Sequence, residues 1–325
     1  MTQPTVAVTG AAGYIGSRVL HDLQKEHPDC NVRALDNFYL GDIRQVGDVE
    51  VEHVDIRDRD RLEDALEGAD VVLHLAAISG VDDCEQRSDL AYEVNVQGTT
   101  NVAWHCRKTG AALVFPFSMA TLGDPLEFPI TVDHPRDPLN WYGRTKQLGE
   151  QTVETMAEGA FPAHCYLKSN LYGGHHIGEQ WVSKGTVINF FINRAIDDKT
   201  LTVYEPGTQA RNFIHVKDVA QAYVRSTKQL LDSLELGKTG IKYYEIASDE
   251  DPSVMEIAQL VQRVTYQELN LDIEVELREN PREETLVTRF DVDNTRTQRE
   301  LGWECEQSVE QTIKRLLSER GDHDV

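Results

Sequence analysis

A tyrosine and a lysine lie four residues apart in the middle of the chain, in the run Tyr142-Gly143-Arg144-Thr145-Lys146. Residues at this spacing share one face of a helix and lie about one turn apart. A phenol with its usual pKa of about 10 is a poor base at neutral pH. A neighbouring ammonium favours the phenolate and lowers that pKa. The pair therefore predicts proton transfer by Tyr142, with Lys146 lowering its pKa, the alternative being an exposed pair with no chemical role.

A second candidate site is a glycine-rich turn near the start of the chain, in the run Thr9-Gly10-Ala11-Ala12-Gly13-Tyr14-Ile15-Gly16. Glycines let the backbone turn tightly and approach a pyrophosphate, which binds at the positive end of the following helix. The GxxGxxG spacing differs from the GxGxxG fingerprint, so a purely structural turn is the alternative. We interpret the segment Gly10, Gly13, Tyr14, Ile15 and Gly16 as a dinucleotide-binding turn.

Residues at the ends of the next predicted strands extend this cofactor site. Asp36 stands twenty residues after Gly16. Its carboxylate is placed to accept hydrogen bonds from a ribose diol and to repel a 2′-phosphate, which favours NAD over NADP. Asp55 ends the third strand, where it binds the adenine amino group or faces solvent. The predicted cofactor contacts at these strand ends are Asp36, Asn37, Asp55, Ile56, Leu75, Ala76 and Ala77.

Four further residues could carry chemistry, and each has a structural alternative. Ser118 follows the fifth predicted strand and is placed to hydrogen-bond a reacting oxygen, the alternative being a strand-end cap. His74 is interpreted as a packed strand residue rather than a catalyst. The pair His175-His176 is interpreted as loop polarity, and no metal site is expected.

The elements that position these residues follow from the apolar pattern. Short apolar runs alternate with longer amphipathic ones in the first half, which predicts βαβ units and a parallel sheet. Strands are expected at 5–9, 31–36, 49–55, 70–77, 111–117, 163–168, 201–204, 212–215 and 242–246. Helices are expected at 15–26, 59–66, 89–108, 141–157, 187–197, 219–231, 253–269, 294–301 and 308–317. Residues 123–140 and 173–185 are expected to be irregular.

This order predicts an α/β fold with a Rossmann-type, doubly wound parallel sheet and a smaller C-terminal substrate-binding lobe. The NAD-binding domain is expected to comprise residues 1–170 plus about 211–240. The substrate-binding lobe is expected to comprise residues 171–210 plus 241–325.

The composition narrows the partners and the environment. A formal charge of −23 argues against nucleic acid and against an anionic membrane as partners. The 32 basic residues divide into 21 arginines and 11 lysines. An acid-rich, lysine-poor surface indicates a halophilic source, the alternative being an ordinary acidic enzyme. Five scattered cysteines, no apolar run of membrane-spanning length and no visible signal peptide predict a cytoplasmic protein with reduced thiols.

Taken together, these residues resemble the extended short-chain dehydrogenase/reductase family, and within it the NAD-dependent nucleotide-sugar epimerases and dehydratases. The resemblance extends from about residue 6 to residue 317. Its further landmarks, in the family's order, are TGAAGYIGS (9–17), HLAA (74–77), YGRTK (142–146), SNLYG (169–173), RNFIHVKDVA (211–220) and LGW (301–303).

The resemblance implies roles for individual residues. Ser118, Tyr142 and Lys146 become a catalytic trio, and Asn95 becomes a structural residue on the cofactor side. Asn170 is assigned to the diphosphate of a nucleotide-sugar, and Arg211 and Arg282 to its phosphates and nucleotide. The family also implies a homodimer formed through the helices near 89–108 and 141–157.

The activity implied is inversion of C4 in a nucleotide-sugar, with a UDP-hexose as the expected substrate, through a transient keto-sugar. The alternatives are a net NAD-linked dehydrogenase or reductase, a dehydratase, and a non-catalytic NAD-binding protein. Dehydratases of the family carry an acidic pair directly after the catalytic hydroxyl residue. Met119 and Ala120 occupy those positions here, which disfavours dehydration.

Overall fold

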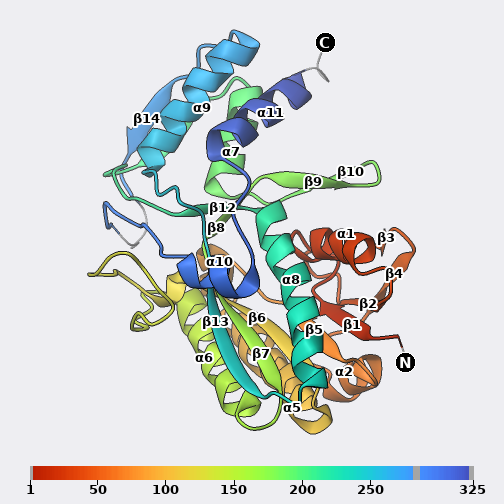
Figure 1. Cartoon of the computed structure of the whole chain (residues 1–325). Coiled ribbons are helices and arrows are strands. Elements are labelled where there is room, and N and C mark those ends of the chain that lie inside the picture. The colour runs from red at the N-terminus through yellow and green to blue at the C-terminus, as the bar shows by residue number, and fades with distance from the viewer. Residues whose placement is uncertain (1–2, 281–285, 322–325) are drawn as a thin grey trace.

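Eight strands form the central sheet of the computed structural model, which describes residues 3–280 and 286–321. They are β1 (Thr5–Thr9), β2 (Asn31–Asp36), β3 (Gln45–Val46), β4 (Val49–His53), β5 (Val71–His74), β6 (Ala112–Ser118), β7 (Pro162–Lys168) and β13 (Gly240–Ile246). Their order is β13-β7-β6-β5-β1-β2-β4-β3 (Figure 1). All neighbours are parallel except β3 and β4. The predicted Rossmann-type fold is confirmed.

Helices cover both faces of this sheet, which explains the continuous apolar runs of its strands. The helices of the first half are α1 (Gly16–Glu26), α2 (Arg59–Leu66), α3 (Val81–Gln86), α4 (Ser88–Tyr92), α5 (Thr99–Thr109) and α6 (Trp141–Ala157). Val6 and Val8 of β1 pack in one core with α1 and with α8 (Val216–Glu235), whereas Ala7 packs in the core of α2, α5 and α6.

The helix predicted over 89–108 is interrupted. Between α4 and α5 the chain forms a π-helix, η1 (Glu93–Gly98). Single π-turns inside α-helices occur frequently at functional sites. Asn95 lies within η1 and is buried, and its amide bonds Ile78 in the segment after β5 and Thr145 of α6.

A second group of elements packs beyond one end of the sheet (Figure 1). Its helices α7 (Val187–Ile196), α9 (Val254–Leu269) and α11 (Val309–Gly321) share a separate apolar core. Three two-stranded sheets accompany them: β8 (Asn170–Tyr172) with β12 (Phe213–His215), β9 (Gly174–Ile177) with β10 (Gln180–Ser183), and β11 (Leu201–Tyr204) with β14 (Val275–Arg278). Two short helices remain: η2 (Met119–Thr121), which directly follows β6, and α10 (Thr295–Leu301), which contacts β13 and α8.

Two segments differ from what was expected of them, residues 173–185 in structure and residues 240–246 in placement. The stretch 173–185, expected to be irregular, contains the antiparallel hairpin β9–β10, so that expectation is wrong. Gly and His have little preference for strands, and the hairpin is short: its partners at the turn end, Ile177 and Gln180, are three residues apart. The division into two lobes stays a prediction, but residues 240–246 pair with β7 in the main sheet.

The topology places ligand sites at the carboxyl ends of the parallel strands. The chain leaves β1 toward β2 on one side, and β5 pairs with β1 on the other side. In open α/β sheets such a reversal leaves a crevice outside the carboxyl ends of the strands. The predicted site residues follow β1, β2, β5, β6 and β7 at these ends. Among the described residues, none of the helices has the length and apolar character to cross a membrane.

Candidate active site

A cavity of about 800 Å³ lies at the carboxyl ends of the central strands. It is bordered on one side by the glycine turn and on the other by the start of α6. The predicted residues that line it are Gly10, Gly13, Tyr14, Ile15, Gly16, Asp36, Asn37, Ile56, Leu75, Ala76, Ala77, Ser118, Tyr142, Lys146 and Asn170. The cofactor and catalytic residues predicted from separate motifs therefore share one cavity.

The glycine turn requires glycine for reasons of space. Gly10 has a φ of +71°, and a Cβ there would lie 2.5 Å from the backbone nitrogen of Ala76. A Cβ at Gly16 would lie 2.1 Å from the carbonyl oxygen of Gly10. At Gly13 a Cβ would meet only that same oxygen, at 3.3 Å, so the turn is open toward the cavity. No side chain caps the N-terminus of α1, and no acidic residue lies in its first turn. These features fit a bound pyrophosphate.

Asp36 is fixed at the end of β2 by backbone amides. Its Oδ2 accepts a hydrogen bond from Ala12 N at 3.0 Å, and its Oδ1 accepts one from Phe38 N at 2.7 Å. Burial raises the pKa of this carboxyl, while those amide bonds oppose the rise. The carboxylate is thus oriented before any ligand arrives, as recognition of a ribose diol requires.

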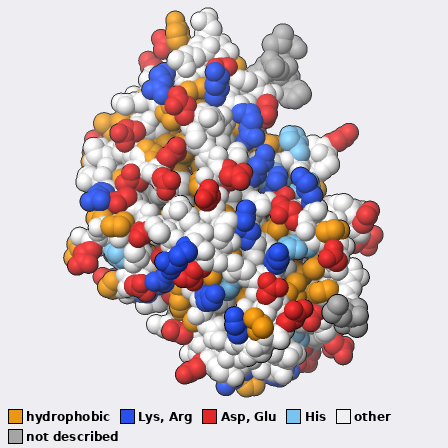
Figure 2. Space-filling model, viewed as in Figure 1, with side chains coloured by type: hydrophobic (Ala, Val, Ile, Leu, Met, Phe, Trp, Pro, Cys, Tyr) orange, Lys and Arg blue, Asp and Glu red, His pale blue; other side chains and the backbone are white. Residues whose placement is uncertain are grey.

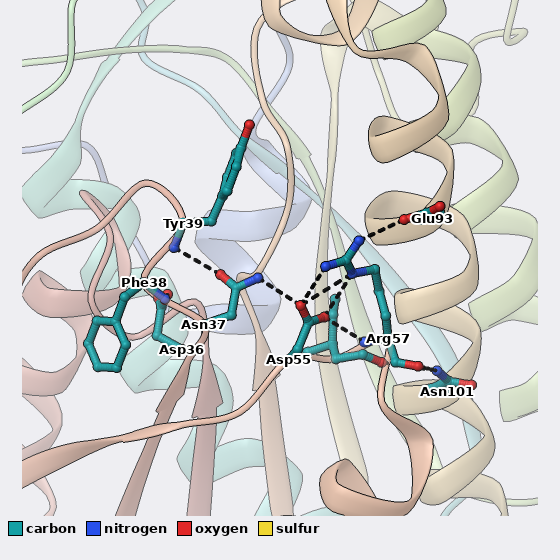
Figure 3. A network of polar contacts seen from close by, with 9 residues as sticks. Asp36, Asn37, Phe38, Tyr39, Asp55, Arg57, Glu93 and Asn101 are labelled. Carbon is teal, nitrogen blue, oxygen red and sulfur yellow. Dashed lines mark hydrogen bonds and ion pairs between the residues drawn. The ribbon is translucent and has the colours of Figure 1, made fainter.

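Asp55 lies beside the cavity rather than in its lining. Figure 3 shows its polar contacts with Asn37 and Arg57. Its Oδ2 accepts a hydrogen bond from Asn37 Nδ2 at 3.1 Å and pairs with the Arg57 guanidinium at 2.8 Å. Arg57 also pairs with Glu93 of η1 at 2.6 Å. The hydrogen bonds from Arg57 hold the pKa of the Asp55 carboxyl at about 2. The carboxylate predicted to meet adenine therefore holds Asn37 and Arg57 in place, and both of these line the cavity.

Asn95 is buried behind the strand-end segment that lines the cavity. Its Oδ1 accepts a hydrogen bond from Ile78 N, and its Nδ2 donates to Ile78 O, both at 2.9 Å. His74, at the end of β5, is buried between Thr9 Oγ1 at 2.8 Å and Thr99 Oγ1 at 3.0 Å. Both residues thus support the site from inside, and the interpretation of His74 as a packed strand residue is confirmed.

The hydroxyl, phenol and ammonium groups of the predicted trio come from two elements. Ser118 ends β6, and its Oγ accepts a hydrogen bond from Ala120 N at 3.2 Å. Helix α6 begins at Trp141 because the Asn140 side chain caps Gly143 N at 2.9 Å, which sets Tyr142 in the first turn. Lys146 follows one turn later, and its Nζ donates to Pro116 O of β6 at 3.4 Å.

The pKa values of Tyr142 and Lys146 are shifted by burial. Burial raises the pKa of the Tyr142 phenol to about 12, and a hydrogen bond with Ser118 opposes the rise. Burial lowers the pKa of the Lys146 ammonium to about 8. The expected lowering of the phenol pKa depends on the Lys146 ammonium together with the positive ring of a bound nicotinamide. In the protein alone, burial is the largest effect on this pKa and raises it. A positive charge brought by a ligand is needed to favour the phenolate.

The resemblance implies three further substrate-binding residues: Asn170, Arg211 and Arg282. The structure describes two of them. Asn170 lines the cavity and donates from Nδ2 to Asn212 O at 3.2 Å. Arg211 is outside the lining, and its guanidinium donates to Ala210 O at 2.8 Å. Arg282 lies outside the described residues. Only Asn170 is thus brought to the cavity among the described members of this set.

Some lining residues were not predicted. Lys168 ends β7, and Lys184 follows β10 and donates from Nζ to Ser79 Oγ at 2.6 Å. Gln180 of the hairpin donates to Asp42 at 2.9 Å, so the hairpin contacts the opposite rim. The position of Lys168 directly before the SNLYG run was a usable signal. The hairpin residues had none, because their place depends on tertiary contacts.

Among residues 3–280 and 286–321, no three His, Cys, Asp or Glu side chains are grouped as a metal site would need. All five cysteines are free thiols.

The parallel sheet, the glycine turn and the Ser118, Tyr142 and Lys146 set define a dinucleotide-binding fold of the extended short-chain dehydrogenase/reductase type. The chain belongs to the NAD-dependent epimerase/dehydratase family, whose model matches residues 6–235.

Individual relatives agree with this assignment. A UDP-glucose 4-epimerase of Rhizobium leguminosarum bv. trifolii is 33% identical over 71% of this chain and 74% of its own. A putative UDP-glucose 4-epimerase of Methanocaldococcus jannaschii is 29% identical over 96% of this chain and 97% of its own. The crystal structure of UDP-glucose 4-epimerase from Brucella ovis, in complex with NAD, has a TM-score of 0.81 and 25% identity over 98% of each chain.

Proposed function

We propose that this protein is an NAD-dependent epimerase that inverts C4 of a nucleotide-hexose, with a UDP-hexose as substrate. The observation that carries the proposal is the single cavity lined by both the glycine turn and the Ser118, Tyr142 and Lys146 set. Relatives named UDP-glucose 4-epimerase match nearly the whole chain, which supports the same reaction.

The residues around the cavity fit NAD. The open turn at Gly13 and the uncapped start of α1 suit its pyrophosphate, and Asp36 suits its adenine ribose. Asn37 and Ile56 line the adenine end, with Asp55 holding Asn37 in position. Lys146, which lines the cavity with Tyr142, is the residue proposed to bind the nicotinamide ribose.

In the proposed mechanism Tyr142 is the base and acid. Bound NAD supplies the acceptor, and later the donor, of the hydride at C4. Tyr142, as phenolate, takes the proton of the C4 hydroxyl. It returns this proton to the keto oxygen after the bound keto-sugar has rotated to present its other face. Ser118 donates a hydrogen bond to that oxygen, which stabilises the charge that develops there. Lys146 favours the phenolate through its positive charge.

The rival reactions make different demands on the site. Met119 and Ala120, the residues directly after Ser118, have no acidic or basic group, so elimination of water lacks an acid and a base there. A net dehydrogenase would release reduced cofactor, whereas the epimerase regenerates NAD within one turnover.

A thermal-shift screen tests the ligand class. UDP-, dTDP- and GDP-hexoses are each added to the protein with NAD, at low and at molar salt. A substrate raises the melting temperature as its concentration exceeds its Kd. We expect the UDP-sugars to stabilise the holoprotein most, and no stabilisation by any nucleotide-sugar would contradict the proposal.

The proposal also covers the oligomeric state, location, source and domain division of the enzyme. A homodimer through α5 and α6 is supported by exposed apolar side chains on this side of the molecule, among them Trp104 and Leu148. The proposed location is the cytoplasm and the proposed source halophilic, for which the free thiols and the net charge of −23 are the support. The two-lobe division is retained, with residues 240–246 in the NAD-binding domain.

A further inference from the structure

Three lysines line the catalytic part of the cavity: Lys146, Lys168 and Lys184. The chain has only 11 lysines and a net charge of −23, so more than a quarter of its ammonium groups gather at one site. The proposed proton transfer uses Lys146 alone. The other two require a separate explanation.

Lys168 lies next to the reacting group through the sheet itself. It is the register partner of Ser118, at the ends of the neighbouring parallel strands β7 and β6. Partners in adjacent strands are about 4.8 Å apart. The backbone of Lys168 pairs within the sheet, but within the described part of the chain its side chain has no hydrogen-bond or ion-pair partner. Its ammonium is therefore available to a ligand that occupies the cavity.

Lys184 approaches from the hairpin side. Its Nζ donates to both the carbonyl oxygen and the Oγ of Ser79, at 2.9 and 2.6 Å, in the segment that follows β5. These contacts hold its side chain across the cavity and leave its charge without a carboxylate in hydrogen-bond contact. Asp83 is the lining acid whose charge acts on Lys184.

The electrostatics of this end call for an anion. Burial, followed by repulsion from Lys146 and Lys184, lowers the pKa of Lys168 to about 7. Of the three lining carboxylates, Asp83 offsets part of the charge of Lys184. Asp36 and Asp42 do not offset the charges, because Asp36 is bonded to backbone amides at the β2 end and Asp42 to Gln180. An anionic ligand group would relieve the repulsion and restore the charged form of the amines.

The phosphates of the cofactor are too far away to be that anion. The glycine turn that suits them follows β1, and β7 is three strands from β1 in the sheet order. Three spacings of about 4.8 Å amount to roughly 14 Å. The diphosphate of a nucleotide-sugar is attached at C1, across the pyranose ring from C4. A carboxylate on C5, by contrast, is attached to the carbon next to C4. Its position relative to C4 corresponds to that of Lys168, which is the strand neighbour of Ser118.

We propose that Lys168, together with Lys184, selects a nucleotide-sugar whose hexose carries a carboxylate on C5, that is, a nucleotide-linked uronic acid. The inference rests on the proposed function, because it takes Ser118 as the residue that meets the C4 oxygen. An ammonium–carboxylate pair formed in a partly desolvated cavity discriminates strongly against a neutral hydroxymethyl group in the same place.

The test compares UDP-glucuronate with UDP-glucose in the NAD-loaded enzyme. Wild type, Lys168→Gln and Lys168→Arg are assayed, with Lys228→Gln as the matched control, since Lys228 is exposed on α8. We expect kcat/KM to favour UDP-glucuronate by about tenfold or more in the wild type and the control, because hydrogen bonds to charged groups contribute about 1.5–3 kcal/mol. Lys168→Gln should lose most of that ratio, and Lys168→Arg should recover part of it.

Binding is measured separately, so that this inference and the proposed function fail in different ways. Thermal stabilisation of the holoenzyme by each sugar nucleotide reports affinity without turnover. Greater stabilisation by UDP-glucuronate that Lys168→Gln removes would support the inference even where neither sugar is epimerised. Equal stabilisation by the two sugars, or an equal loss for both in Lys168→Gln, would overturn it. Turnover of UDP-glucose alone would also overturn it while leaving the epimerase proposal intact.

Discussion

Asn95 in the π-helix η1 donates a hydrogen bond of 3.0 Å from Nδ2 to Oγ1 of Thr145, which lies between Tyr142 and Lys146 on α6. Both side chains are buried. The same amide bonds the backbone of Ile78 twice, in the segment after β5. One side chain thus joins the cofactor wall to the catalytic helix. The interruption of the helix between α4 and α5 is what brings it there.

The Asn95→Leu variant tests this connection. It leaves the Ile78 N–H without its acceptor and the Ile78 C=O with only the weak donor Cys84 Sγ. An unsatisfied buried group costs about 1–3 kcal/mol. We expect the free energy of unfolding to fall by about 2 kcal/mol or more and turnover to fall with it. Thr155→Ala is the control, since Thr155 is exposed on α6, the helix that carries Thr145, and its side chain bonds only Gln151 O. An Asn95 variant as stable and active as the control would refute the role.

Tyr142→Phe isolates the proton transfer. Without the hydroxyl, the ring can still pack against the core of α2, α5 and α6. The proton of the C4 hydroxyl, however, has no acceptor. General acid–base groups contribute about 10²–10⁴-fold, so kcat should fall within that range. The Kd for NAD, measured by calorimetry, should change little. Tyr266→Phe, at an exposed tyrosine of α9, serves as the control. Undiminished turnover would remove Tyr142 from the mechanism.

Buried neutral histidines predict how stability depends on pH. His164 of β7 is hydrogen-bonded to Ser226 Oγ at 2.7 Å, and burial lowers its pKa to about 3. In the unfolded chain its pKa is about 6.5, so the unfolded state binds the proton first as the pH falls. The free energy of unfolding should therefore decrease between about pH 6.5 and pH 3.

Denaturant unfolding at several pH values measures that slope. In His164→Gln the slope should become shallower, whatever the stability of the variant at neutral pH. His53→Gln, at an exposed position of β4, should keep the slope of the wild type. An unchanged slope in His164→Gln would show that other groups account for the acid sensitivity.

Salt should stabilise this protein. Acidic side chains are spread over the face seen in Figure 2, with basic ones between them, and the net charge is −23. Raising the ionic strength from 0.1 to 1 M shortens the Debye length from about 10 to about 3 Å, which reduces self-repulsion. We expect the melting temperature and the activity to rise with KCl up to molar concentrations, and not with equimolar sucrose. Full stability and activity in dilute buffer would contradict halophilic adaptation.

The sequence pattern predicted the regular elements of the sheet well. The ranges of β1, β2, α2 and α6 agree with the predicted ones, because each is an apolar run or an amphipathic run with clear limits. Asn140, for example, marks the start of α6 by a local hydrogen bond to Gly143 N. Local chemistry of this kind can be recognised without a partner segment.

What the sequence did not predict depends on contacts between distant segments. The π-turn around Asn95 is tied to Ile78 and Thr145, and the hairpin β9–β10 is held by Asp42 and Ser79. The position of Lys168 directly before the SNLYG run can be read from the sequence, but its register with Ser118 depends on the pairing of β6 and β7. The raised pKa of Tyr142 has the same origin, since it reflects burial rather than the spacing to Lys146.

The central claim is that a bound NAD is reduced and reoxidised within one turnover at C4. The most direct test incubates the NAD-loaded enzyme with a UDP-hexose or UDP-hexuronate and follows two signals in one sample. Proton NMR reports the C4 epimers, and absorbance reports reduced nicotinamide. We predict that the epimers reach the same ratio from either starting sugar, with no reduced nicotinamide beyond the amount of enzyme. Reduced nicotinamide formed in proportion to the sugar consumed would contradict the account.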